Sequence, residues 1–311
     1  MTSRAAGEYP PVPEPLAVPG VDTHTHLDMC TGVRGPIKDG EPAPEVQPDE
    51  GEDYPSLDFF YDTAMQVGIR RIVQIGCDLP ASRWTLQTVR EQAKLGRDWM
   101  LGGAAIHPNE APRLAAAGIL DDALTEIEAL CTADARMRVV GETGLDYFRT
   151  AEAEQPAQWE SFRAHCEIAK RHDLVLQIHD RHAHADVLRI LDDIGAPEKT
   201  VLHCFSGDAD FARECAARGF YMSFAGNATF KNAADLREAC RAVPAELLLT
   251  ETDAPFLTPH PYRGKPGGPY LTAVTLATLA EVRGASVEQV AEQSTANAEA
   301  VFGAWELASA H

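Results

Sequence analysis

The sequence contains no apolar run of 18 or more residues, and its first 19 residues lack the apolar segment of a signal peptide. The first absence argues against a transmembrane helix, and the second argues against export by a signal peptide. We therefore predict a cytoplasmic protein with no membrane partner.

Clustered cysteines are also lacking. Seven cysteines are scattered along the chain, and no two of them form a Cys-x-x-Cys pair. An odd, unclustered set predicts reduced, buried thiols in a reducing compartment. Cys204 stands beside His203, and we interpret it as a packed neighbour and not as a metal ligand.

Positive charge is scarce, because 27 Lys and Arg residues face 47 Asp and Glu residues and give a net charge of −20. This balance disfavours broad, non-specific attraction to nucleic acid. It leaves room for a small cationic patch, or for a metal site that supplies its own positive charge. The hydrophobic content of 45% is ordinary for a globular protein with a sizeable core.

Short apolar segments alternate with segments of helical period from one end of the chain to the other. The predicted strands lie within residues 21–28, 70–76, 99–106, 138–142, 174–179, 200–203, 220–225 and 247–253. The predicted helices are 56–67, 81–95, 119–131, 155–172, a segment ending near 194, 208–218, 232–242 and the tail from 271. Apolar strands that alternate with amphipathic helices predict a parallel sheet covered by helices. Eight such units in 311 residues predict one α/β domain, a (β/α)8 TIM barrel.

The first predicted strand carries the polar residues that organise the rest. In the stretch Val21–Asp28, His24 and His26 share one face of the strand with Asp22, because side chains alternate between faces. Two imidazoles about 7 Å apart along a strand can converge on one metal ion. Ordinary packing explains an isolated His-x-His pair equally well. A metal site is therefore predicted only if other strands also contribute ligands.

Strong metal ligands stand at the ends of other predicted strands. The full candidate set is His24, His26, Glu142, His179, His203 and Asp253. The carboxyl ends of barrel strands form the face on which active sites lie. Buried imidazoles in an apolar core would lack hydrogen-bond partners, so four histidines and two carboxylates in register predict a metal site.

Six ligands exceed the needs of one tetrahedral ion, so we predict two divalent ions (Zn, Mg or Mn) with an open position for water. Glu142 would bridge them. His24, His26 and Asp253 would complete one ion, and His179 and His203 the other. A metal-activated hydroxide would be the nucleophile, and Asp253 would orient it and receive its proton. The predicted catalytic residues are therefore Asp253 and Glu142.

These residues lie in motifs that resemble the TatD family of metal-dependent deoxyribonucleases in the amidohydrolase superfamily. The motifs are Asp22–His26, Ile106–Pro108, Gly141–Tyr147, Gln177–His179, Leu202–Asp208 and Thr250–Pro255. The resemblance covers residues 20–303, which it identifies as a TatD-like barrel hydrolase domain between a flexible segment 1–19 and a tail 304–311. It implies a 3′–5′ exonuclease acting on the 3′ end or single strands of DNA, and we expect a monomer or weak oligomer.

Residues 31–55 form an acidic, proline-rich stretch that we interpret as an insertion in the first strand-to-helix loop. It is either a tolerated loop, the reading we favour, or a mobile flap over the site. The sequence alone does not decide between them.

Several cations and one aromatic residue follow predicted strands and are candidates for substrate binding. They are His107, Arg181, Arg263, Lys265 and Tyr147. The cations could hold phosphate oxygens, and Tyr147, like Phe148, could stack on a base. Each cation is equally explained as a solvated surface charge, and each aromatic residue as a wall of the barrel mouth. Gly267 and Gly268 depart from the family pattern beside Arg263 and Lys265.

Two other functions remain open. The first is an amidohydrolase-superfamily hydrolase of a small phosphoester, lactone or amide, because fold does not fix the substrate. The second is a non-catalytic scaffold that keeps metal for stability. It predicts closed coordination and an Asp253→Asn variant that keeps the protein's function.

Overall fold

The computed structural model describes residues 9–33 and 54–306. Most of the insertion predicted at 31–55 lies outside these residues, so its two interpretations stay as predictions. No helix within the described ranges combines the length and the apolar character needed to cross a membrane. All seven cysteines are free thiols, as predicted, and only Cys204 is not fully buried.

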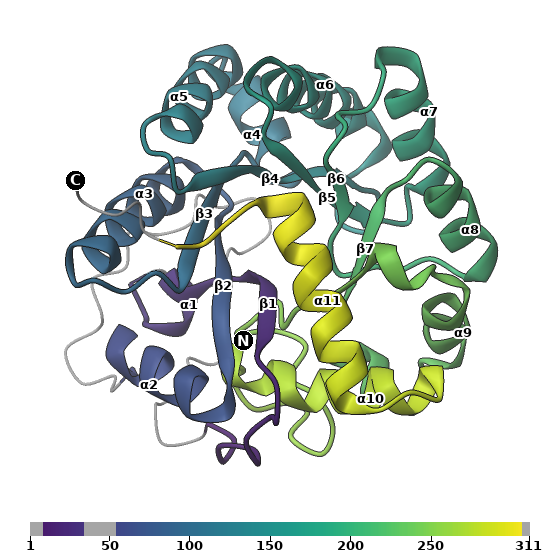
Figure 1. Cartoon of the computed structure of the whole chain (residues 1–311). Helices are drawn as coiled ribbons and strands as arrows, with labels where there is room; N and C mark the ends of the chain where they lie inside the picture. Colours follow the sequence, from purple (N-terminus) through teal and green to yellow (C-terminus); the bar gives the residue numbers. More distant parts are fainter. Residues whose placement is uncertain (1–8, 34–53, 307–311) are drawn as a thin grey trace. The chain divides into compact units, whose positions relative to one another are not determined.

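Eight strands alternate with helices along the chain (Figure 1). The strands are β1 (Gly20–Thr25), β2 (Ile69–Gly76), β3 (Met100–Ala104), β4 (Met137–Asp146), β5 (Val175–Arg181), β6 (Thr200–Leu202), β7 (Tyr221–Phe224) and β8 (Leu248–Thr250). They follow one another in the order β1-β2-β3-β4-β5-β6-β7-β8 in one sheet. This order confirms the predicted (β/α)8 barrel class.

Helices follow the strands as predicted, with two additions. The helices are α1 (Leu27–Cys30), α2 (Leu57–Val67), α3 (Leu79–Lys94), α4 (Ala111–Ala116), α5 (Leu120–Thr132), α6 (Gln155–His172), α7 (His184–Ile194), α8 (Ala209–Ala217), α9 (Ala234–Ala242), α10 (Thr272–Arg283) and α11 (Val287–Phe302). The short helices α1 and α4 were not predicted, because four and six residues are too few to show a helical period.

Local sequence signals fix several helix ends. Asp78 caps α3 and Asp208 caps α8, each accepting a hydrogen bond from a backbone N–H of the first turn. Ser286 and Gln289 form a reciprocal capping box at the start of α11. Each such cap contributes about 1 kcal/mol to helix stability.

The chain divides into two compact units. Unit 1 comprises the described residues of Met1–Pro36 and Glu45–Gln74, with Gly207–Gly303. Unit 2 comprises Ile75–Ser206 and the described residues of Ala304–His311.

In unit 1, β1 pairs in parallel with β2, and β7 with β8. An isolated parallel bridge joins Thr25 to Ala254, directly beyond the ends of β1 and β8. Helices α10 and α11 pack on β1. Hydrogen bonds fix the described part of the N-terminal segment to this unit. Leu16 N–H donates to the Val67 carbonyl at 2.8 Å, and the Tyr270 hydroxyl donates to the Pro10 carbonyl at 2.7 Å.

In unit 2, β3, β4, β5 and β6 pair in parallel, and helices α3, α5 and α6 pack against them (Figure 1). The prediction that Glu142 ends its strand is wrong, because β4 continues to Asp146, which pairs with Arg181 at the end of β5. Likewise β5 extends two residues past His179. Gly144 makes the extension possible, since a Cβ there would lie 2.1 Å from the His179 carbonyl oxygen.

Candidate metal centre

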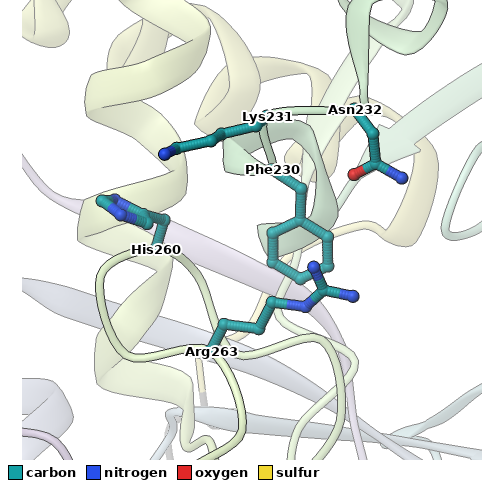
Figure 2. Close-up of a pocket in the computed structure, with 5 residues that line it drawn as sticks. All are labelled: Phe230, Lys231, Asn232, His260 and Arg263. Atoms are coloured by element: carbon teal, nitrogen blue, oxygen red, sulfur yellow. The ribbon is translucent and has the colours of Figure 1, made fainter.

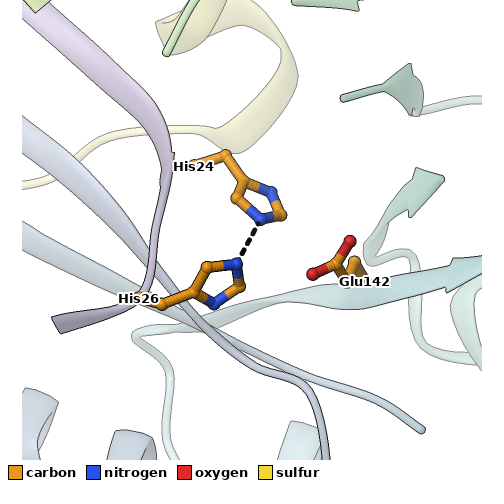
Figure 3. A group of neighbouring side chains, drawn as sticks. All are labelled: His24, His26 and Glu142. Carbon is orange, nitrogen blue, oxygen red and sulfur yellow. Dashed lines mark hydrogen bonds between the residues drawn. The ribbon is translucent and has the colours of Figure 1, made fainter. Parts of the chain in front are cut away.

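Three predicted ligands of unit 1 come together at the ends of β1 and β8, and we call His24, His26 and Asp253 the β1 cluster. The Nε2 atoms of His24 and His26 face each other at 3.1 Å (Figure 3). Asp253 Oδ1 lies 3.3 Å from His26 Nε2 and 3.8 Å from His24 Nε2. Both imidazoles are buried, whereas the Asp253 side chain is 15% exposed. The three ligand atoms therefore form a small triangle whose carboxylate member is partly exposed.

Main-chain hydrogen bonds position the β1 cluster. Asp253 N–H donates to the His24 carbonyl at 2.9 Å, and His26 N–H donates to the Ala254 carbonyl at 2.8 Å. These two bonds fix the loop after β8 against the end of β1. Asp253 itself has a φ of 55°, in the left-handed region that few non-glycine residues adopt. Strain of this kind is typical of functional positions.

Asp22 supports the same cluster, and the sequence did not reveal this role. Its buried carboxylate accepts hydrogen bonds from His24 N–H at 3.2 Å, Thr252 N–H at 2.9 Å and the Thr252 hydroxyl at 2.6 Å. Burial raises the pKa of Asp22 well above its ordinary value, and these hydrogen bonds oppose the rise. Asp22 therefore fixes the backbone at His24 and at Thr252, the residue before Asp253.

Three predicted ligands of unit 2 form a second triangle, and we call Glu142, His179 and His203 the β4 cluster. Glu142 Oε2 lies 3.1 Å from His179 Nδ1 and 2.7 Å from His203 Nε2. The two imidazole nitrogens lie 3.5 Å apart. Glu142 stands within β4 and His179 within β5, while His203 directly follows β6. Glu142, drawn alone from this cluster in Figure 3, is buried.

The surroundings of Glu142 favour its ionised form. Burial alone would raise its pKa, but the nearby imidazoles of His203 and His107 and hydrogen bonds from His179 and His203 hold the pKa well below its ordinary value. The Cys77 thiol also donates to Glu142 Oε1 at 3.3 Å. The carboxylate is thus charged across the physiological range and suited to bind a cation.

Asp146 orients His179, which sequence reasoning also missed. Its Oδ2 lies 3.4 Å from His179 Nε2 and accepts a hydrogen bond from the Asn109 side-chain amide at 3.1 Å. Burial lowers the pKa of His179, but Asp146 and Glu142 outweigh it and raise the pKa to about 9. A carboxylate behind an imidazole is the usual arrangement for a metal-ligating histidine, with the other ring nitrogen facing the ion.

His107, predicted to hold phosphate, lies beside the β4 cluster. Its Nε2 is 3.8 Å from Glu142 Oε2, and its Nδ1 accepts a hydrogen bond from Asn109 N–H at 3.1 Å. Burial lowers the pKa of His107 to about 3, so the ring is neutral. Because Nδ1 is an acceptor, the proton sits on Nε2, which suits a hydrogen-bond donor better than a metal ligand.

His165 on α6 is a further buried residue that no motif indicated. Its Nε2 accepts from Ile106 N–H at 3.1 Å, and its Nδ1 lies 2.7 Å from the Ser161 carbonyl and 3.1 Å from the Thr143 hydroxyl. Burial lowers its pKa to about 4. A neutral His165 therefore joins the residue before His107 to the residue after Glu142.

Both triangles fit a metal ion. Ligand atoms about 2.1 Å from a tetrahedral ion lie roughly 3.4 Å from one another. The edges measure 3.1, 3.3 and 3.8 Å in the β1 cluster and 2.7, 3.1 and 3.5 Å in the β4 cluster. The ligand atoms of His107, Glu142 and His179 likewise lie within 4.8 Å of one another. Nitrogen and carboxylate donors at these spacings suit Zn²⁺ and similar ions.

The predicted substrate contacts of unit 2 are engaged with neighbouring side chains. Tyr147 donates its hydroxyl to Asp186 at 2.6 Å and accepts from Trp159 Nε1 at 2.6 Å. The Arg181 guanidinium lies 3.9 Å from the ring centre of Phe148, which is 58% exposed. Phe148 is therefore the more accessible aromatic surface of the two.

The predicted contacts of unit 1 lie in the loop after β8. Arg263 and Lys265 are both exposed. The Arg263 guanidinium lies 4.4 Å from the ring centre of Phe230, and the Lys265 backbone is fixed by hydrogen bonds to Tyr262 and Thr258. Neither residue contributes to the β1 cluster.

Comparisons with known proteins show the family to which the chain belongs. A family model described as TatD related DNase matches residues 21–303. The chain is 37% identical over 287 residues to "Uncharacterized metal-dependent hydrolase TatD" of Mycobacterium tuberculosis, across 91% of this chain and 97% of that protein. It is 35% identical over 235 residues to "Uncharacterized metal-dependent hydrolase YabD" of Bacillus subtilis, across 75% and 88% of the two chains.

Solved structures share the fold. The TatD homologue YJJV of Escherichia coli matches with a TM-score of 0.74 and 23% identity, covering 92% of this chain and 98% of that one. The organophosphorus hydrolase of Deinococcus radiodurans matches with a TM-score of 0.60 and 15% identity, covering 92% and 93%. Identity this low concerns the fold alone, whereas the family model spans most of the sequence. The chain therefore belongs to the TatD-related DNase family.

Proposed function

We propose that this protein is a metal-dependent DNase that hydrolyses phosphodiester bonds of DNA, acting as a 3′–5′ exonuclease at a site for two divalent ions. The β1 cluster would hold one ion, and the β4 cluster, with Glu142 as its carboxylate, would hold the other. Family membership and the metal-dependent hydrolases among the relatives support the reaction class.

One observation carries the proposal. Each cluster offers two imidazole nitrogens and one carboxylate oxygen, with all edges between 2.7 and 3.8 Å. The imidazoles and Glu142 stand within a parallel strand or at the residue that follows one, and Asp253 lies in the loop after β8. Ordinary packing would not bring six such groups into two triangles of ligand spacing.

The ions, when bound, would supply Lewis-acid stabilisation of phosphoryl oxygens and lower the pKa of a coordinated water. The remaining work falls to the chain's own residues. Asp253 is the partly exposed member of the β1 cluster and would accept the proton of the attacking water at Oδ1. The water oxygen would bond to phosphorus as one P–O ester bond breaks, and the proton held by Asp253 would pass to the leaving oxygen, directly or through solvent.

Other residues would hold the substrate. Neutral His107 would donate its Nε2 proton to a phosphoryl oxygen, consistent with its Nδ1 acceptor bond. Arg181 and Lys265 would contact backbone phosphates. Phe148, with Tyr147 beside it, would supply the stacking surface for a base.

The experiment is a cleavage assay on single-stranded DNA labelled at its 3′ or 5′ end. The protein is stripped of metal and then loaded with Mg²⁺, Mn²⁺ or Zn²⁺, and the Asp253→Asn and Glu142→Ala variants are run beside it. We expect metal-dependent shortening from the 3′ end that both variants lose.

The control is Glu128→Gln, which removes a carboxylate that is paired with Arg171 and His172. It should cleave DNA as the unaltered protein does. Absence of DNA cleavage with all three metals would contradict the DNase proposal and direct the search to small phosphoesters, lactones and amides. Normal cleavage by Asp253→Asn would contradict the assigned role of Asp253.

A further inference from the structure

Unit 1 contains a pocket that the proposed chemistry does not use. It has a volume of about 350 Å³, and Figure 2 shows the residues that line it: Phe230, Lys231, Asn232, His260 and Arg263. No member of the β1 cluster is among them. A lysine, an arginine and a histidine thus line one pocket of a chain whose net charge is −20.

Two loops build this pocket, which we call the Phe230 pocket, and contacts between them fix it. One loop follows β7 and the other follows β8. His260 N–H donates to the Thr229 hydroxyl at 2.8 Å. The loops also approach closely at Gly226, where a Cβ would lie 2.1 Å from the Leu257 carbonyl oxygen. One hydrogen bond to a side-chain hydroxyl and one close backbone approach therefore hold the two loops together.

Arg237 braces the first loop from within. One of its terminal nitrogens donates to the Ala228 carbonyl at 3.0 Å and to the Phe230 carbonyl at 2.8 Å. These hydrogen bonds fix the backbone of the loop that carries Phe230 and Lys231. Arg263 differs, because its guanidinium lies against the Phe230 ring of the same loop.

Arg263 and Lys231 supply the arginine and the lysine of the pocket lining. The Arg263 guanidinium lies over the Phe230 ring, 4.4 Å from its centre (Figure 2), a cation–π contact that leaves a guanidinium free to donate in its own plane. Within residues 9–33 and 54–306, neither cation has a carboxylate within ion-pair distance. Many other cations of this chain are paired, such as Arg83 with Glu126 and Arg163 with Asp193.

We propose that the Phe230 pocket binds a backbone phosphate of the DNA strand, at a nucleotide other than the one being cleaved. This inference rests on the proposed function, since it names a second contact for the same substrate. A guanidinium fork held on a ring and a mobile ammonium group are the donors that suit phosphate oxygens. The loop after β8 carries both Asp253 and Arg263, so one segment links the reacting group to the pocket.

The test compares the double variant Lys231→Gln, Arg263→Gln with the control Arg70→Gln, Arg213→Gln. The control removes the same charge from exposed positions of the same unit. Binding of a fluorescently labelled single-stranded oligonucleotide is followed by anisotropy in the presence of EDTA, across a series of salt concentrations. Steady-state cleavage of the same oligonucleotide and of bis(p-nitrophenyl) phosphate is measured with metal added.

We expect the pocket variant to bind DNA at least about tenfold more weakly than the control. Its salt slope should be smaller by about 0.7 for each phosphate that the variant no longer neutralises. It should raise KM for the oligonucleotide with kcat little changed, and leave turnover of bis(p-nitrophenyl) phosphate unaltered, because that diester is too small to reach a second phosphate site.

Equal affinities and salt slopes for the pocket and control variants would overturn the inference, whether or not the protein cleaves DNA. A protein that binds DNA through this pocket but cleaves none with any metal would support the inference and defeat only the nuclease proposal. Slower turnover of bis(p-nitrophenyl) phosphate by the pocket variant alone would also overturn it, since it would place these residues at the cleaved bond.

Discussion

The two ligand clusters have similar donors but are held by different means. In the β1 cluster, main-chain hydrogen bonds between His24, His26 and the Asp253–Ala254 peptide set the geometry. In the β4 cluster, side chains set it. Asp146 lies behind His179, and His165 joins Ile106, which precedes His107, to Thr143, which follows Glu142. One cluster thus depends on backbone placement and the other on a chain of buried polar side chains.

This difference determines which property each cluster should lose when a supporting residue is substituted. A side-chain substitution in the β4 network should change the orientation or charge of an imidazole while the strands stay in place. A substitution that releases the backbone of the β1 cluster should lower the stability of unit 1 as well as activity. The predictions below are ordered from the largest expected effect to the smallest.

Asp253→Asn should have the largest effect. It keeps the size of the side chain but removes its basicity, so kcat for DNA should fall by about 10³-fold, within the usual range for a lost general base. The melting temperature should change little, because the substituted side chain is partly exposed. Steady-state cleavage and thermal unfolding measure both quantities. A fall of less than tenfold would show that Asp253 is not the proton acceptor.

Asp146→Asn should weaken the β4 cluster alone. Removing the charge behind His179 Nε2 leaves the ring less basic, and such changes typically cost 10- to 100-fold in metal affinity or activity. Added metal should restore part of the lost rate, which distinguishes weak metal binding from misfolding. Titration of the activity with metal provides the measurement. Equal metal requirements in variant and unaltered protein would contradict the role given to Asp146.

Asp22→Ala should reveal the backbone dependence of the β1 cluster. It removes the carboxylate that accepts from two buried N–H groups and one hydroxyl, so the free energy of unfolding should fall by about 2 to 4 kcal/mol. Asp22→Asn is the matched control, because its amide oxygen can still accept from both N–H groups. Denaturant unfolding should therefore show a much smaller loss for Asn. Equal losses would indicate that the carboxylate charge matters, and not the hydrogen bonds.

His165 should make the smallest contribution, visible as a pH dependence. Burial lowers its folded-state pKa to about 4, below the ordinary 6.5, so the unfolded state binds more protons between these values. Stability is therefore complete above pH 6.5 and is lost as pH falls towards 4. Between pH 7 and 5.5 this loss amounts to about 1 kcal/mol.

The His165→Gln variant isolates that contribution from the other titrating groups. Denaturant unfolding of the metal-free protein at several pH values should give a shallower decline for the variant than for the unaltered protein. Parallel declines would show that His165 does not carry the effect.

The (β/α)8 class was predicted correctly from the sequence, and the six residues proposed as ligands were selected from it, because both depend on local patterns. Strand and helix periods are visible within a window of residues, and His24 and His26 belong to one strand. The supporting residues could not be predicted in this way. Asp22 and Thr252 are 230 positions apart, and His165 and Ile106 are 59 apart. Only the folded chain brings these pairs together.

Strand ends were also misjudged for a physical reason. The Gly-Leu-Asp sequence after Thr143 has the composition of a turn, yet Gly144 continues the strand because the neighbouring backbone approaches too closely for a side chain. The Phe230 pocket was missed for a similar reason. Arg263 was predicted as a candidate contact. Phe230 and Lys231 could not be predicted, because only the folded chain places them beside the loop that carries Arg263.

The central claim is that the two clusters hold one ion each, and counting metal tests it most directly. Zn²⁺-loaded protein, freed of excess metal, is analysed by mass spectrometry under non-denaturing conditions, together with His26→Ala for the β1 cluster and His179→Ala for the β4 cluster. We predict two ions per chain in the unaltered protein and one in each variant. A single ion in the unaltered protein, or two ions retained in both variants, would contradict the claim.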